Sequence, residues 1–292
     1  YADLVKASDR FAAALQGLGI GKGDRVAIML PNIPQFVVAY YGILKAGAIL
    51  VNVNPTYTSY ELKHSLHDSG ARAIVMLSGL VGRLAPIRDE VAIEQVIVCD
   101  IGDTIGIPFK WLVEKQMRTT GMMKNVEYGS TVHHFDALQR NAPATYTPVT
   151  ITPDDVALFQ YTGGTTGVAK AAMLTHRNLV ANCMQMDAWF TRVKFGAEKW
   201  LLALPAFHVY GMSAGLLLGV RFGAEIIMLP DPRNTSHVLE VIARQKVSIY
   251  IGVPAMYIAL INHPRIKEFD LSSIEACFSG GASLPVEGAQ QV

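Results

Sequence analysis

The chain has 292 residues, a formal net charge of +1, three cysteines, 51% hydrophobic residues and 17% charged residues. This composition excludes an intrinsically disordered protein, and the near-neutral charge argues against nucleic acid as a partner. Cys99, Cys183 and Cys277 lie far apart, which favours a reducing, cytoplasmic compartment over a disulfide framework or a zinc knuckle.

A helical pattern opens the chain, because Leu4, Phe11, Leu15 and Leu18 share one helical face. The chain does not begin with Met, and its last residues resemble a helix that is cut short. We interpret the sequence as a fragment of a longer protein, or as its ordered part.

Short apolar runs alternate with amphipathic segments from there on. Strands are predicted at residues 25–30, 49–52, 73–77, 95–98, 156–160, 200–204, 224–229, 247–251 and 274–278. Helices are predicted at 33–46 and at 58–67, where Thr58 and Glu61 form a candidate capping box. Residues 101–150 lose the rhythm and are interpreted as an insertion and a connector. The alternation predicts an α/β fold with mostly parallel sheets covered on both faces.

One apolar stretch, residues 200–220, is long enough to cross a bilayer and contains no Asp, Glu or Lys before Arg221. Pro205 interrupts it early and His208 is ionisable. We therefore interpret it as a buried strand followed by a buried helix, with insertion into a membrane as the alternative.

The segment after the strand at 156–160 combines three glycines, three threonines and a lysine between Thr162 and Lys170. Glycines let backbone N–H groups approach an anion, and hydroxyl and ammonium groups add donors. Thr175 is a candidate N-cap of the helix that follows. The pattern favours a polyphosphate-binding loop, and an ordinary glycine-rich turn is the alternative. The predicted phosphate-binding residues are Thr162, Gly163, Gly164, Thr165, Thr166, Gly167 and Lys170.

The spacing fits neither of the common nucleotide motifs. A Walker A loop has Gly directly before its Lys, where this chain has Ala169. The dinucleotide fingerprint separates its first two glycines, whereas Gly163 and Gly164 are adjacent.

Three stretches in order resemble the adenylate-forming superfamily of acyl-CoA synthetases, adenylation domains and firefly-type luciferases. They are residues 161–178, the histidine-aromatic stretch 204–212 and the Ser-Gly-Gly-Ala-Ser-Leu-Pro stretch 279–285. The residues of these stretches most resemble those of bacterial long-chain fatty acid–CoA ligases, and the resemblance spans the whole chain. Ala171 departs from the family's usual glycine. The later aromatic-Gly-x-Thr-Glu segment, a ribose-binding aspartate and a small C-terminal domain are absent.

The resemblance implies that residues 1–292 are the large N-terminal domain, truncated at both ends, with two stacked α/β subdomains. Subdomain A would span about 22–190, and subdomain B would combine about 1–20 with 195–292. The implied reaction is ATP- and Mg²⁺-dependent adenylation of a long-chain fatty acid, followed by transfer to CoA. We expect this chain alone to turn over poorly or not at all.

The resemblance also assigns residues to that reaction. His208 and Lys170 would be catalytic, although a histidine in an apolar run is more often a satisfied core residue. Gly280, Gly281 and Ala282 would lie against the adenine, with a tight strand-to-helix turn as the alternative. The acyl-binding candidates, each of which could equally be core, are Tyr210, Gly211, Met212, Val253 and Pro254.

No metal site is predicted. His64 and His67 have the spacing of a ligand pair on a helix, but a third ligand is lacking and an exposed helical face is favoured. Residues 109–124 mix basic and bulky apolar side chains, which suits either a subdomain-edge helix or peripheral contact with the inner face of the membrane. Homodimerisation is left open.

Several other functions remain open at this stage. An aryl- or short-chain acid ligase would differ only in the shape of its acyl tunnel. A peptide-synthetase adenylation domain would carry an acidic residue for an α-amino group, and none is evident. A non-catalytic nucleotide-binding protein belongs to a different class.

Overall fold

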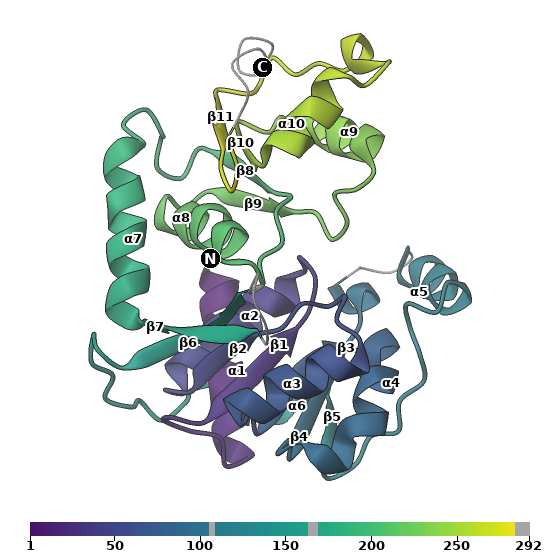
Figure 1. Cartoon of the computed structure of the whole chain (residues 1–292), viewed down its shortest axis with the longest axis vertical. Coiled ribbons are helices and arrows are strands. Elements are labelled where there is room, and N and C mark those ends of the chain that lie inside the picture. Colours follow the sequence, from purple (N-terminus) through teal and green to yellow (C-terminus); the bar gives the residue numbers. More distant parts are fainter. Residues whose placement is uncertain (105–108, 163–168, 284–292) are drawn as a thin grey trace. The chain divides into compact units, whose positions relative to one another are not determined.

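The predicted strands of the first half of the chain form one mostly parallel sheet. The structure is a computed structural model that describes residues 1–104, 109–162 and 169–283. The chain divides into unit 1, Tyr1–Asn178, and unit 2, Leu179–Val292. Figure 1 labels the elements of both units. The expectations for Gly163 to Gly167, and for a helix at the end of the chain, lie outside the described residues.

Among the described residues, the sheet of unit 1 has seven strands in the order β5-β4-β3-β1-β2-β6-β7. The strands are β1 (Arg25–Met29), β2 (Ile49–Asn52), β3 (Ala73–Leu77), β4 (Gln95–Cys99), β5 (Val132–His134), β6 (Val156–Thr162) and β7 (Lys170–Thr175). All neighbours pair in parallel except β6 and β7, which are antiparallel. The predicted α/β class is therefore confirmed, and β7 is a strand that the sequence pattern missed.

The helices of unit 1 are α1 (Ala2–Gly17), α2 (Pro34–Lys45), α3 (Ser59–Ser69), α4 (Val81–Leu84), α5 (Phe109–Thr119) and α6 (Phe135–Asn141). Short 3₁₀ helices lie at Ser78–Leu80, Ala85–Glu90 and Ile101–Thr104. The predicted capping box is confirmed, because Thr58 Oγ1 accepts from the Glu61 amide and the Glu61 carboxylate accepts from the Thr58 amide.

The two faces of this sheet are covered by different helices. Successive strand residues point to opposite faces. Ala27 and Met29 of β1 therefore face the same core as Leu62 and Leu66 of α3. Figure 1 shows α3 lying across this face of the sheet. Every residue of β3 is buried, as expected for a central parallel strand.

Helix α1 packs in unit 1, which differs from the expected grouping of residues 1–20 with residues 195–292. The ring of Phe11 stacks on that of Phe135 in α6, with centroids 4.9 Å apart. A Cβ atom at Gly42 of α2 would lie 2.7 Å from Phe11, so only glycine allows this approach of α2. The apolar face of α1 thus packs against α2 and α6. The periodicity of the sequence predicts such a face but not the helices that cover it.

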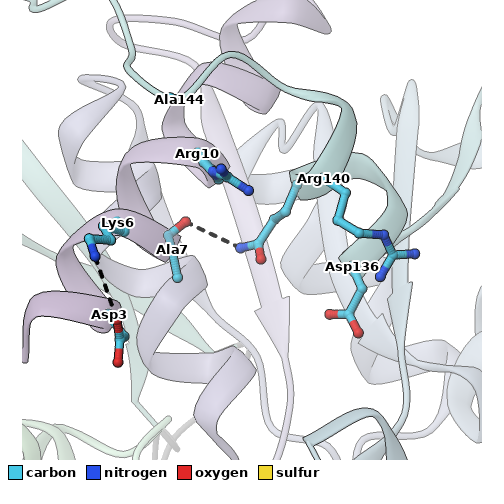
Figure 2. Close-up of a pocket in the computed structure, with 8 residues that line it drawn as sticks. Asp3, Lys6, Ala7, Arg10, Asp136, Arg140 and Ala144 are labelled. Atoms are coloured by element: carbon cyan, nitrogen blue, oxygen red, sulfur yellow. Dashed lines mark hydrogen bonds and ion pairs between the residues drawn. The ribbon is translucent and has the colours of Figure 1, made fainter.

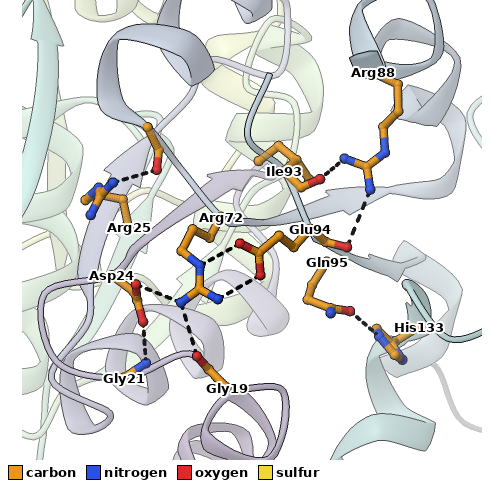
Figure 3. Close-up of polar contacts among 11 residues, drawn as sticks. Gly19, Gly21, Asp24, Arg25, Arg72, Arg88, Ile93, Glu94, Gln95 and His133 are labelled. Atoms are coloured by element: carbon orange, nitrogen blue, oxygen red, sulfur yellow. Dashed lines mark hydrogen bonds and ion pairs between the residues drawn. The ribbon is translucent and has the colours of Figure 1, made fainter. Parts of the chain in front are cut away.

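A polar network closes the end of the sheet where β1, β3 and β4 begin (Figure 3). The Arg72 guanidinium donates to both oxygens of Glu94 at 2.8 and 2.7 Å, and lies 2.9 Å from Asp24 Oδ1. Asp24 Oδ2 accepts from the Gly21 amide at 2.9 Å. These contacts raise the pKa of Arg72 and lower that of Glu94. We call this group the amino-edge network.

Among the described residues, unit 2 has a parallel sheet of four strands in the order β11-β10-β8-β9. The strands are β8 (Lys199–Leu202), β9 (Glu225–Met228), β10 (Ile249–Gly252) and β11 (Ala276–Ser279). The helices are α7 (His176–Trp189), which spans the unit boundary, a π-helix at Gly211–Leu217, α8 (Leu218–Arg221), α9 (Thr235–Gln245), α10 (Pro254–Ile261) and a 3₁₀ turn at Ile266–Glu268. Thr175 is confirmed as the cap of α7, since its Oγ1 accepts from the Asn178 amide.

The core of unit 2 explains the long apolar stretch. Trp200 of β8 is fully buried with Leu218 and Phe222 on one side of the sheet, while Leu201 packs with Val238 and Ile242 of α9 on the other. In the part of the chain that the structure describes, no helix is long and apolar enough to cross a membrane. The interpretation of residues 200–220 as strand plus helix is confirmed.

Candidate functional site

The predicted phosphate segment leaves the sheet at the carboxyl end of β6 and re-enters it as β7. Thr162 and Lys170 are partners in the antiparallel pairing of these strands. Thr162 Oγ1 donates to the Lys170 carbonyl oxygen at 3.3 Å, and both side chains are exposed. Gly163, Gly164, Thr165, Thr166 and Gly167 lie outside the described residues. The residues that bracket the segment are thus brought together at the edge where parallel α/β sheets bind ligands.

The Lys170 side chain projects from this stem as a cation. Among the described residues, no carboxylate forms an ion pair with it. By contrast, Lys22, also in unit 1, lies 2.9 Å from Asp155. An ammonium with no partner at a strand end is suited to an anionic ligand.

Two side chains hold this stem through contacts that no sequence pattern predicted. Tyr161 is buried, and its hydroxyl donates to Asp68 Oδ2 at 2.7 Å and lies 3.1 Å from the Ser65 carbonyl oxygen. Burial and the bond to Asp68 raise the pKa of the Tyr161 phenol. His64 Nε2 lies 2.8 Å from the Ala169 carbonyl oxygen. The only sequence signal was the spacing of His64, Ser65 and Asp68 on one side of a helix.

The paired-histidine pattern on α3 has two different outcomes. His64 is half-buried and bonded to Ala169, which corrects the expectation of an exposed face, whereas His67 is exposed. Within residues 1–104, 109–162 and 169–283, no group of three or more His, Cys, Asp or Glu side chains could hold a metal ion.

In unit 2, His208 is exposed, so the alternative of a buried core histidine is wrong. Its amide donates to the Pro205 carbonyl at 3.0 Å, and its carbonyl accepts from the Met212 amide at 2.9 Å. The Tyr210 amide donates to His208 Nδ1 at 3.3 Å. In the neutral ring this bond leaves the proton on Nε2. The imidazole therefore presents a donor to solvent.

The chain after His208 turns tightly into the π-helix that begins at Gly211. A Cβ atom on Gly211 would lie 2.2 Å from the Pro205 carbonyl oxygen, so a side chain there would displace the backbone. Single π turns occur often at functional sites. Here the turn leaves His208 exposed and Tyr210 half-buried, while Met212 is fully buried.

Tyr210 reaches the end of β11. Its hydroxyl donates to the Phe278 carbonyl at 3.3 Å, and a Cβ atom on Gly280 would lie 2.7 Å from its ring. Tyr257, which the sequence analysis did not single out, lies 2.8 Å from the same carbonyl through its hydroxyl. Burial raises the pKa of both phenols, so each keeps its proton at neutral pH.

The predicted adenine and acyl residues fall into exposed and buried groups. Gly281 has a φ of +78°, and a Cβ atom there would be 3.4 Å from the Val253 side chain. Gly281 and Ala282 are exposed, whereas Gly211, Met212 and Pro254 are buried. The structure thus brings Tyr210 and Val253 to the Gly280–Gly281 turn. Their roles remain predictions.

Two hollows lie apart from these residues. A cavity of about 600 Å³ on α1 and α6 has mixed charges, with Lys6 3.9 Å from Asp3 (Figure 2). Its lining residues are Asp3, Lys6, Ala7, Arg10, Asp136, Gln139, Arg140 and Ala144. A second cavity of about 430 Å³ in unit 2 is lined by Phe190, Val193, Ile249, Ala276 and Phe278, among others. Among the described residues, none of the predicted site residues lines either cavity.

Known proteins resemble this chain throughout its length. The model of the AMP-binding enzyme family matches residues 1–292. A long-chain-fatty-acid–CoA ligase of Bacillus subtilis (strain 168) is 39% identical over 297 residues, covering 100% of this chain and 52% of that protein. One from Escherichia coli O157:H7 is 37% identical over 290 residues, covering 98% and 51%. The crystal structure of ATP-bound MatB from Rhodopseudomonas palustris superposes with a TM-score of 0.81 at 25% identity, covering 100% of this chain and 51% of that one.

The chain spans about half the length of the curated relatives it matches. The family match covers both units. On the full-length match and the parallel α/β architecture, the chain belongs to the AMP-binding enzyme family.

Proposed function

We propose that this chain is part of an ATP-dependent long-chain fatty acid–CoA ligase. In the first step, a carboxylate oxygen of the fatty acid attacks the α-phosphorus of ATP, and pyrophosphate leaves as acyl-AMP forms. In the second step, the CoA thiolate attacks the acyl carbon, and AMP leaves as the thioester forms. The relatives that carry the long-chain name cover nearly all of this chain, which supports the chain-length class.

The observation that carries the proposal is the geometry around Lys170. Its backbone is paired with Thr162 at the carboxyl end of β6, and its exposed ammonium has no carboxylate partner among the described residues. The proposal gives Lys170 and Thr162, together with the glycines and threonines between them, the β- and γ-phosphates of ATP. The reaction brings two anions together, so a cation on the leaving pyrophosphate lowers the barrier.

His208 has the complementary task in unit 2. With Nδ1 accepting from the Tyr210 amide, its Nε2–H is available to donate to a carboxylate or α-phosphate oxygen. The backbone hydrogen bonds to Pro205 and Met212 fix the main chain of His208, from which the ring projects. We assign His208 the stabilisation of negative charge during attack.

The turn after β11 and the side chains beside it are assigned to the base and the acid. Gly280, Gly281 and Ala282 carry little or no side chain, which suits a flat adenine. Tyr210, Gly211, Met212, Val253 and Pro254 are apolar surroundings for a fatty chain, which gains about 0.8 kcal/mol per buried CH₂.

Mg²⁺ enters with ATP as part of the substrate. The exposed groups at the stem, the hydroxyl of Thr162 and the ammonium of Lys170, suit the phosphate oxygens of a Mg²⁺–ATP complex. Mg²⁺ in such sites is held mainly by phosphate oxygens and water. The residues of this chain then bind and orient the Mg²⁺–ATP complex.

Acid-dependent exchange of labelled pyrophosphate into ATP tests the proposal, using the natural full-length protein with acetate, octanoate, palmitate and benzoate. We expect exchange to rise steeply from acetate to palmitate. CoA should then convert the palmitoyl-adenylate to thioester. Exchange with palmitate that does not exceed acetate or benzoate would overturn the long-chain assignment, and no exchange with any acid would overturn the ligase.

A further inference from the structure

Helix α3 contacts both ends of the predicted phosphate segment. At the entrance, the hydroxyl of Tyr161 donates to Asp68 at 2.7 Å. At the exit, His64 Nε2 lies 2.8 Å from the Ala169 carbonyl. We infer that His64 is a positioning residue that fixes Lys170 for phosphate binding through the backbone. This inference rests on the proposed function, in which Lys170 binds the ATP phosphates.

The helix that carries His64 is a rigid platform. Its first turn is closed by the Thr58–Glu61 capping box, and its opposite face is fixed by Leu62 and Leu66, both fully buried. His64 and Asp68 are one helical turn apart, so their side chains lie on the same face. A contact from this face is therefore made from a helix that is anchored by its cap and by its buried side.

The bond from His64 acts on the peptide that leads into Lys170. A carbonyl oxygen only accepts, so Nε2 of His64 must carry the hydrogen. The Ala169 carbonyl belongs to the same planar peptide as the Lys170 amide. On the other side, the Lys170 carbonyl accepts from Thr162 Oγ1 at 3.3 Å. The peptide groups on both sides of Lys170 are therefore hydrogen-bonded, which fixes the position of its Cα atom.

The surroundings of His64 favour positioning over the other functions of histidine. Its ring meets that of Tyr161 edge-to-face, with centroids 6.2 Å apart at 77°. Among the described residues, no group of three or more His, Cys, Asp or Glu side chains that could hold a metal ion was found, His64 included. Nε2 of His64 is occupied by its bond to a backbone carbonyl, which is a contact that positions backbone.

The kinetic test compares His64→Ala with His64→Gln and uses His67→Ala, on the exposed face of the same helix, as matched control. In pyrophosphate exchange by the full-length protein, we expect His64→Ala to raise the KM for Mg²⁺–ATP about tenfold while the KM for the fatty acid stays unchanged. Gln can also donate to Ala169 and should recover most of the loss. His67→Ala should match the wild type. Equal changes in both KM values, or equal effects at His64 and His67, would overturn the inference.

Hydrogen exchange gives a reading that does not depend on catalysis. Without nucleotide, the amides of residues 170–172 at the start of β7 should exchange about tenfold faster in His64→Ala than in the wild type or in His67→Ala. If wild-type protein shows no acid-dependent activity, the ligase proposal fails, while the exchange rates still decide whether His64 fixes the stem. Unchanged protection at these amides would show that it does not.

Discussion

The two edges of the sheet in unit 1 treat charge in opposite ways. At the amino edge, Arg72 lies between Glu94 and Asp24, and each of these three charges has an opposite charge within 3 Å. At the carboxyl edge, Lys170 points outward with no carboxylate partner among the described residues, and the carboxyl group of Asp100 is buried. Charges that satisfy each other stabilise a fold, whereas charges left unmatched at a strand end are available to a ligand or to a proton.

Tethering differs between the edges as well. The amino-edge network joins side chains to side chains across strand starts (Figure 3). At the carboxyl edge, His64 and Tyr161 connect a helix to the stem around Thr162 and Lys170. The first arrangement neutralises charge, and the second holds backbone so that a cation can be presented. Substitutions at the two edges should therefore separate activity from stability.

The largest effect is expected for Lys170→Ala. Because we propose that this cation binds the leaving phosphates, its removal should lower kcat/KM for ATP in pyrophosphate exchange by about 100- to 1000-fold. The melting temperature should change little, because the side chain is exposed and unpaired within the described residues. Lys6→Ala, at another exposed lysine of unit 1, is the control. A large loss of stability without loss of activity would assign Lys170 to the fold.

The second effect concerns pH and Asp100, the residue after β4. Asp100 is buried and accepts from Ser78 Oγ at 2.5 Å, and burial raises its pKa from 3.8 to about 6. Between these values the folded state retains a proton that the unfolded state has lost. Stability is therefore full below about pH 4 and falls as the pH rises through about 6, by up to about 3 kcal/mol.

Asp100→Asn tests this sign directly. The variant carries no titrating proton, so its free energy of unfolding relative to wild type should increase from about pH 4 to about pH 7 in urea titrations. Asp154→Asn is the opposite control, because the hydrogen bond from Arg177 lowers the pKa of Asp154. Parallel curves for wild type and Asp100→Asn would contradict the assignment.

Sequence patterns predicted the central strands of both sheets because those strands are apolar and local. The predictions at 49–52 and 73–77 match β2 and β3 residue for residue. They missed β7, whose six residues, Lys170–Thr175, include none that is buried. They also missed the short strand β5 and the short helix α6 inside 101–150, whereas the edge helix offered for residues 109–124 is present as α5. Edge elements are defined by their partners, which a one-dimensional pattern does not contain.

The same limit applies to the site. His208, Thr162 and Lys170 could be named as candidates from motif order, since each motif is contiguous in the chain. His64 and Tyr161 are 97 positions apart in the chain and become neighbours only when α3 packs over β6. The spacing of His64 and His67 predicted a metal pair or a solvated face, yet the partner of His64 is a backbone carbonyl. Every residue type has such a carbonyl, so no side-chain pattern could identify this partner.

The smallest effect, at the amino edge, decides whether the comparison holds. Arg72→Ala leaves Asp24 and Glu94 without their shared cation, and because these side chains are partly exposed we expect a loss of about 1 kcal/mol in the free energy of unfolding. The loss should shrink at about 1 M NaCl, where screening weakens the network. Arg233→Ala, whose partner Asp231 is two residues away on an exposed turn, should cost less. The KM for Mg²⁺–ATP should not move in either variant. A rise in that KM for Arg72→Ala would mean that the two edges are coupled, and that the carboxyl edge depends on the charge balance of the amino edge as well as on the contacts of α3.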